Sequence, residues 1–148
     1  MDSKYGPLFS IEHKKIYDEK HNISGDKVSA LCFNSRFGWH VSRFYRFLIL
    51  EDLVCLYCEG ETGLAGQHIV MPLGDITSEK IEKIASFYYT AFEEKGNRLK
   101  FMFVPDNKLD LFKNVNGYDY EIFNSVDFDE YVYDTEVLKE LKGKQLKS

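Results

Sequence analysis

Three strand-like segments follow one another with short connections, and this feature constrains the fold more than any other. The segments are Arg43–Leu50, Leu53–Cys58 and Gln67–Met71, each rich in aromatic or branched residues. Glu51-Asp52 forms a tight turn between the first two, and Glu59–Gly63 forms a looser turn before the third. Connections this short join only antiparallel neighbours, so the sequence predicts a three-stranded meander.

Two helices are expected before the meander. A short strand at Pro7–Ile11 precedes a polar helix at His13–His21. Ser24-Gly25-Asp26 then offers capping side chains for a second helix, which the apolar spacing predicts to end near Phe37-Gly38.

The helix after the meander carries the clearest pattern. Thr77 is predicted to cap it and Gly96 to end it. Its apolar residues recur with a helical period and are Ile81, Ile84, Ala85, Tyr88 and Phe92.

Shorter elements complete the chain. We expect a strand at Leu99–Val104, a short helix capped by Asp106 and a strand at Tyr118–Phe123. A further helix is predicted at Thr135–Leu141.

This order of elements is that of the GNAT fold, used by acyltransferases related to the histone N-acetyltransferases. The predicted class is therefore α/β (α+β), with a mixed, mostly antiparallel sheet flanked by helices. The 148 residues suit a single GNAT-like domain, with a core at about 1–126 and a C-terminal extension at 127–148.

Composition excludes several classes of protein. A formal net charge of -5 argues against general nucleic-acid binding. The first residues lack the apolar segment of a signal peptide, and no apolar run is long enough to cross a bilayer. Three cysteines among apolar neighbours do not form a disulfide framework. We expect a cytoplasmic protein without a transmembrane segment.

The segment Met71–Thr77 is where a GNAT enzyme would hold coenzyme A. Such an enzyme uses a glycine-rich loop whose backbone N–H groups bind the pyrophosphate. Here Pro72 removes one donor, only Gly74 allows close approach, and Asp75 adds a negative charge. The sequence therefore predicts an ordinary strand-to-helix turn and no cofactor.

Other reactive residues are better explained as structural. Cys55 and Cys58 lie in a strand pattern and point to opposite faces, and no second ligand pair completes a metal site. His68 is expected to be a hydrogen-bonded structural histidine, and Arg46 to need a carboxylate partner. We therefore assign no catalytic residue and no metal ligand.

Trp39 lies close to Arg36 and Arg43, so it is either part of a ligand-binding rim or a structural aromatic anchor. The tyrosine pairs Tyr88-Tyr89, Tyr118/Tyr120 and Tyr131/Tyr133 either line a pocket or pack in the core.

The segment Asp127–Lys144 resembles a signature of the phosphatidylglycerol lysyltransferase C-terminal domain family, in which an aspartate and tyrosines lead into a short helix and then Leu-x-Gly-Lys. Ser24–Trp39 and Met71-Pro-Leu-Gly74 are similar to two further motifs of that family. The resemblance extends from about Ser24 to Lys144.

The resemblance implies one half of a tandem acyltransferase-like protein, because family members are about twice as long. Better-understood relatives transfer an amino acid from aminoacyl-tRNA to a lipid or a peptidoglycan precursor. The sequence given stops four residues after Lys144, so the expected partner is a separate second half or a second copy of this chain. The candidate contacts for a phosphate-bearing ligand, either RNA or a lipid head group, are then Trp39, Tyr131, Tyr133, Lys142 and Lys144. The alternative for the C-terminal lysines is a solubilising tail.

The leading functional prediction is thus an acyltransferase-like domain related to lipid lysyltransferases, without catalytic competence alone. Two alternatives stay open. One is a non-enzymatic binding or assembly module on the same scaffold, and the other is a small-molecule N-acyltransferase with an atypical cofactor loop.

Overall fold

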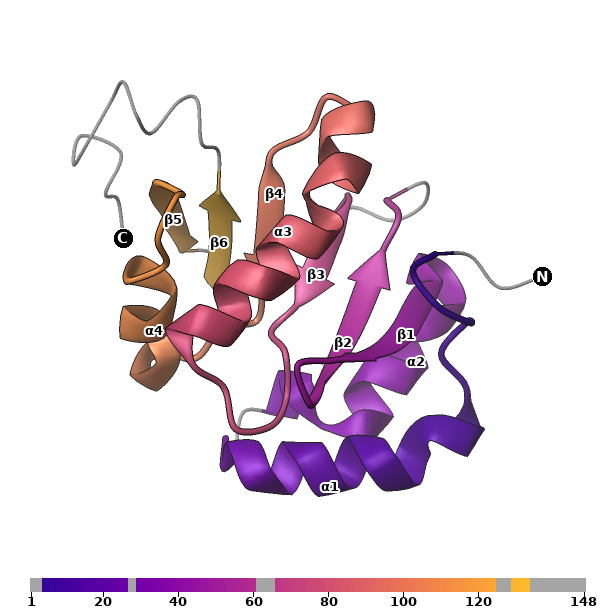
Figure 1. Ribbon diagram of the computed structural model, residues 1–148. Coiled ribbons are helices and arrows are strands. Elements are labelled where there is room, and N and C mark those ends of the chain that lie inside the picture. Colours follow the sequence, from indigo (N-terminus) through magenta and orange to yellow (C-terminus); the bar gives the residue numbers. More distant parts are fainter. Residues whose placement is uncertain (1–3, 27–28, 61–65, 125–128, 134–148) are drawn as a thin grey trace. The chain divides into compact units, whose positions relative to one another are not determined.

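The computed structural model describes residues 4–26, 29–60, 66–124 and 129–133. The chain divides into two compact units, Met1–Ile76 and Thr77–Ser148, and each is described by itself (Figure 1). Both units combine antiparallel strands with helices, so the fold belongs to the mixed α+β class.

The first unit contains two α-helices, two short 3-10 helices and three strands. In chain order these are η1 (Ile11–His13), α1 (Lys14–Ser24), η2 (Ser29–Leu31), α2 (Phe33–Arg43), β1 (Tyr45–Leu50), β2 (Leu53–Cys58) and β3 (His68–Val70).

The predicted meander is confirmed. β1 pairs antiparallel with β2 from Tyr45↔Cys58 to Leu50↔Leu53, and β2 pairs antiparallel with β3. All six residues of β2 are buried, which fits its position between two neighbouring strands. On the outer edge of β1, the N-terminal segment forms an antiparallel bridge between Leu8 and Arg46.

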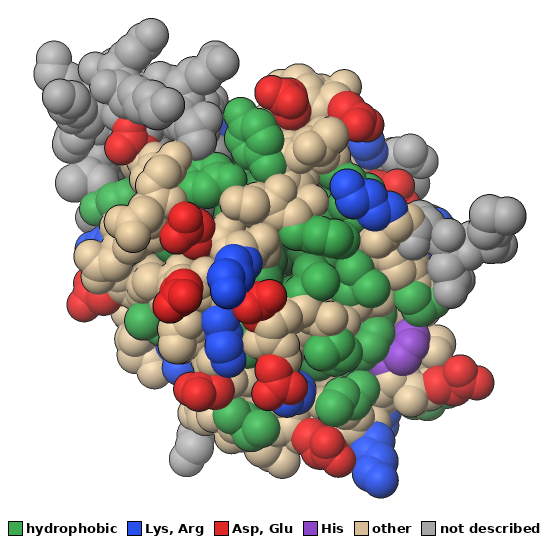
Figure 2. Space-filling view, viewed as in Figure 1, with side chains coloured by type: hydrophobic (Ala, Val, Ile, Leu, Met, Phe, Trp, Pro, Cys, Tyr) green, Lys and Arg blue, Asp and Glu red, His purple; other side chains and the backbone are tan. Residues whose placement is uncertain are grey.

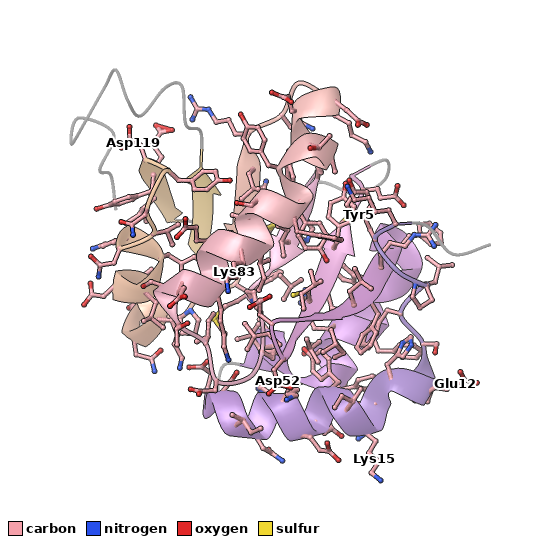
Figure 3. The ribbon with its side chains drawn as sticks, viewed as in Figure 1. Tyr5, Glu12, Lys15, Asp52, Lys83 and Asp119 are labelled. Carbon is pink, nitrogen blue, oxygen red and sulfur yellow. The ribbon has the colours of Figure 1, made fainter. Side chains whose placement is uncertain are left out.

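The two-residue turn between β1 and β2 is built from unusual residues. Glu51 and Asp52 both have positive φ, 53° and 63°. A two-residue hairpin turn of this kind normally uses Asn-Gly. The Lys20 ammonium of α1 donates to the Asp52 carboxylate over 2.7 Å. Asp52 is labelled in Figure 3.

The helices of this unit differ from the prediction at two points. Ser24 ends α1, and Gly25 caps that end with a φ of 74° and an N–H bonded to His21 O. The Ser24-Gly25 pair therefore terminates the first helix instead of capping the second. The second helix also continues through Gly38 to Arg43, because one glycine inside a helix costs only about 1 kcal/mol.

Aromatic rings form the core between these helices and β1. The Phe9 ring lies 5.3 Å from Phe33 and 6.1 Å from Phe47, measured between centroids. Tyr17 is fully buried and its hydroxyl donates to Leu31 O. A chain with 16% aromatic residues thus fills this core with few side chains.

The second unit contains two α-helices, one 3-10 helix and three strands. These are α3 (Ser78–Glu94), β4 (Leu99–Met102), η3 (Asp106–Lys108), α4 (Leu109–Lys113), β5 (Tyr120–Asn124) and β6 (Asp129–Tyr133).

Helix α3 confirms the strongest helix prediction. The Thr77 hydroxyl accepts the backbone N–H of Lys80 over 3.2 Å, as an N-cap should. Gly96 follows the C-terminus with a φ of 71°. The five residues predicted to recur on one face are all buried, and they are Ile81, Ile84, Ala85, Tyr88 and Phe92.

The strands of the second unit pair antiparallel in the order β4-β6-β5. β6 was not predicted, although it is the central strand of these three. Strand β4 ends at Met102, two residues earlier than expected, because Phe103 has a φ of 66° that breaks the extended backbone. The predicted cap Asp106 is instead the first residue of η3. The predicted helix at 135–141 lies outside the described residues.

Candidate functional site

A buried polar network lies inside the first unit and joins α2, β1 and β3. The Arg36 guanidinium donates from Nη1 to the Tyr45 hydroxyl over 3.0 Å. That hydroxyl lies 3.2 Å from Nε2 of His68, whose Nδ1 lies 2.8 Å from Gly66 O. Arg36 is 2% exposed, and Tyr45 and His68 are 0% exposed.

The hydrogen-bonding partners determine which atom donates and which accepts in each bond of this network. Gly66 O can only accept, so Nδ1 of His68 carries a hydrogen. In the neutral ring Nε2 is then the acceptor, and the Tyr45 hydroxyl donates to it while accepting from Arg36. Both ring nitrogens of His68 are therefore satisfied, which confirms the structural role predicted for this histidine.

Arg46 of β1 has the carboxylate partner that the sequence analysis required. Its Nε lies 3.3 Å from Glu59 Oε1, and its Nη1 donates to Gly6 O over 3.4 Å. Nearby, Gln67 donates to the Tyr57 hydroxyl over 2.7 Å. Burial raises the pKa of Tyr57 to about 12, so this phenol stays protonated near neutral pH.

The Met71–Thr77 loop is held by bonds inside the first unit. The N–H of Gly74 donates to the Ser24 hydroxyl over 2.8 Å, and that hydroxyl donates back to Gly74 O over 3.3 Å. The N–H of Leu73 donates to Val54 O over 3.0 Å. These two donors are thus occupied, whereas a pyrophosphate site needs loop N–H groups that point at the ligand.

Gly74 is also packed too tightly to leave space beside its backbone. A Cβ at this position would lie 2.6 Å from Leu53 Cδ2 and 3.1 Å from Asp52 O. Its φ of 140° further favours glycine. The close approach that Gly74 permits is therefore to the β1–β2 turn of its own unit.

The three cysteines are free thiols with different surroundings. Cys55 and Cys58 are buried in β2, and burial raises the pKa of the Cys55 thiol. Cys32 precedes α2, and its Sγ lies 3.3 Å from Ser35 Oγ. This hydrogen bond, with smaller contributions from the backbone of Ser35 and Asn34, lowers the pKa of Cys32.

The second unit has its own polar contacts. Arg98 pairs with the buried Glu121 of β5. The rings of Tyr89 and Tyr118 lie 6.2 Å apart, and Ser86 Oγ lies 3.4 Å from the Tyr118 hydroxyl. Tyr118 thus contacts α3, and this pair of tyrosines packs between α3 and the segment that leads into β5.

The predicted ligand-binding residues lie in different parts of the chain. Trp39 lies in α2 of the first unit. Tyr131 and Tyr133 lie in β6 of the second unit, where they pair with Phe101 and Leu99 of β4. Lys142 and Lys144 lie outside the described residues.

Two observations concern other classes of site. Among the described residues, no group of three His, Cys, Asp or Glu side chains is arranged to hold a metal ion. No helix in the described part of the chain has the length and apolar content that a membrane span requires.

The network and the Ser24 contact were missed by sequence reasoning. Tyr45 and His68 are 23 residues apart, and Ser24 and Gly74 are 50 apart. The aromatic and branched strand pattern around Tyr45 gave no signal of a polar partner, whereas His68 inside a predicted strand did indicate a buried partner.

Comparison with known proteins gives a likeness of fold only. No protein-family model and no curated protein matches the chain. The chain is similar to a solved structure described as a conserved protein of unknown function from Bacteroides thetaiotaomicron VPI-5482, with a TM-score of 0.61 and 11% sequence identity. The match covers 79% of this chain and 39% of that one, so the chain spans well under two thirds of the longer protein.

Proposed function

We propose that this chain is the acyltransferase-like part of a two-half protein related to aminoacyl-tRNA-dependent lipid lysyltransferases, and that it does not catalyse transfer alone. The observation that carries the proposal is the Met71–Thr77 loop. Its Leu73 and Gly74 donors are bonded to Val54 and Ser24. Under the proposed GNAT-like fold, this segment corresponds to the cofactor loop. A transferase that takes its acyl group from aminoacyl-tRNA does not need loop N–H groups that bind the pyrophosphate of coenzyme A.

The length of the similar solved chain supports a two-half architecture. Since 79% of this chain corresponds to 39% of that one, that protein is about twice as long. The order of helices and meander in the first unit also fits the beginning of a GNAT-like half.

In this proposal the chain helps to hold an anionic lipid head group. Lys142 and Lys144 supply positive charge in the segment of the sequence that follows the aromatic residues Tyr131 and Tyr133. Each lysine near an anionic membrane surface contributes about 1 kcal/mol, so the attraction is weak and depends on salt. Trp39 is the proposed aromatic contact from the first unit.

Vesicle flotation tests this role. The purified chain should float with phosphatidylglycerol vesicles at low salt and remain unbound with phosphatidylcholine vesicles. The double variant K142A/K144A should lose the binding. The matched control K15A/K83A removes the same charge from two exposed lysines of the described units and should keep it. Equal loss in both double variants, or equal binding to both lipids, would contradict the proposal.

A second measurement tests the loop. Acetyl-coenzyme A binding to the folded chain would raise the melting temperature in proportion to the logarithm of its concentration. We expect no shift. A clear rise would refute the argument from Leu73 and Gly74 and would favour the small-molecule N-acyltransferase.

Exposed apolar side chains favour one alternative, a binding or assembly module. In the first unit Leu8, Ile11 and Ile49 are 45%, 60% and 42% exposed. Figure 2 shows hydrophobic side chains gathered over the β1–β2 part of this unit. Under this alternative the chain would form a stable dimer by light scattering, and substitution of Ile49 by Lys would disrupt it.

A further inference from the structure

The N-terminal segment is held on the outer edge of β1 by two backbone hydrogen bonds. The N–H of Phe9 donates to Tyr45 O over 2.8 Å, and the N–H of Phe47 donates to Pro7 O over 2.8 Å. A strand edge with unpaired backbone groups is a template for unwanted pairing, and this segment covers it.

The segment ends in a helical turn that depends on a histidine. The backbone N–H of Ser10 donates to Nδ1 of His13 over 3.0 Å. Glu or Gln usually occupies this third position after a Ser N-cap, where its side chain accepts the N–H of the cap residue. Here an imidazole takes that place, and it can accept only while Nδ1 carries no proton.

The His13 ring also contacts β1 directly. It stacks on the Phe47 ring with centroids 4.0 Å apart and planes within 3°, and it is stacked on Phe9 at 6.0 Å. The ring therefore links the helical turn, the N-terminal segment and β1. Phe9 itself is 1% exposed, so its side chain anchors the N-terminal segment in the core of the first unit.

We propose that His13 is a pH-sensitive latch that fastens the segment Gly6–Ser10 to the edge of β1. Protonation of Nδ1 removes the acceptor for the Ser10 N–H and places two donors face to face. The latch is thus closed when His13 is neutral and weakened when it is charged.

The surroundings of His13 favour its neutral form, in which the latch is closed. Partial burial lowers the pKa of His13, and the neighbouring Glu12 carboxylate, which points outward in Figure 3, opposes this shift only in part. β1 presents the uncharged Phe47 ring, while Arg46 belongs to the opposite face of the strand and pairs with Glu59. On α1, Lys14 and Asp18 pair with each other.

The sign of the effect follows from this shift. A histidine whose pKa is lower in the folded state stabilises the fold above its unfolded value of about 6.5. That contribution is lost as the pH falls below this value. The segment should therefore open more often in mildly acidic solution.

Amide hydrogen exchange of the Phe9 and Phe47 N–H groups measures the opening directly, after correction for the intrinsic pH dependence of exchange. Between about pH 7.5 and pH 5 their protection should fall about fivefold, the equivalent of one lost hydrogen bond. The N–H of Val54, bonded to Leu73 O, serves as the internal reference for the body of the unit.

Two variants separate the latch from simple packing. His13→Gln keeps an acceptor for the Ser10 N–H but does not titrate, so protection should become independent of pH. His13→Ala should show low protection at both pH values. A pH-dependent loss in His13→Gln equal to that of the natural protein, an unchanged protection in the natural protein, or an equal fall at Val54 would each overturn the proposal.

Discussion

Substitution of Gly74 by alanine tests the packing of the Met71–Thr77 loop. The added Cβ would lie 2.6 Å from Leu53 Cδ2 and 3.1 Å from the backbone oxygen of Asp52. Both distances are shorter than an ordinary contact, and Leu53 is fully buried. The φ of 140° adds backbone strain for any residue with a Cβ.

The two costs can be separated and summed. Backbone strain at a positive φ costs about 1–2 kcal/mol. Overpacking of a well-filled site costs about 1–3 kcal/mol. We therefore expect Gly74→Ala to lower the free energy of unfolding by about 3 kcal/mol, or ~6–12 °C in melting temperature for a chain of this size.

Urea unfolding followed by tryptophan fluorescence is the appropriate assay, because Trp39 is the single tryptophan and belongs to the same unit as Gly74. Gly25→Ala is the matched control. Gly25 also has a positive φ, 74°, but nothing lies within 4 Å of its added Cβ. It should cost only the strain, about 1 kcal/mol.

The comparison of the two variants decides the matter. Equal losses for Gly74→Ala and Gly25→Ala would refute the claim of a close approach. In the Gly74→Ala background, Leu53→Val removes the methyl group that clashes and should recover about 1 kcal/mol, whereas alone it should only destabilise.

Three further predictions concern the cysteines, the hairpin turn and the buried network. Cys32 should react with a thiol reagent in the folded protein, while Cys55 should react only on unfolding, as measured by thiol titration with and without urea. Glu51→Asn should raise the free energy of unfolding by about 0.5 kcal/mol because Asn tolerates a positive φ. A lower free energy of unfolding in urea denaturation would contradict this prediction. Tyr45→Phe removes the hydroxyl that joins Arg36 to His68 and should cost about 2 kcal/mol in the same assay, while a neutral effect would show that the network is dispensable.

Local patterns in the sequence were sufficient for the elements of clear period. The β1–β2 hairpin and α3 could be predicted because the turn residues, the Thr77 cap and the apolar spacing all lie within a few residues of one another. β6 could not, because Asp129-Glu130 begins it with two charges and its stability comes from pairing with β4 and β5 on either side.

The candidate site shows the same limit at the level of single residues. Ser24 reads as a capping residue from its neighbours alone, but its hydroxyl bonds to Gly74, which lies far along the chain. The Tyr45–His68 bond likewise depends on how β1 and β3 are placed around β2. Contacts of this kind are set by the meander as a whole, so no local pattern reports them.

The contacts of Gly74 have a consequence for the order in which the chain is made. The bonds that close the first unit, from Val54 to Leu73 and from Ser24 to Gly74, are completed only two residues before the unit ends at Ile76. During synthesis, the nascent chain therefore carries every partner of these bonds as soon as Ile76 has left the ribosome. Since N-terminal units generally fold first during synthesis, the first unit can close before α3 and the strands after it have left the ribosome.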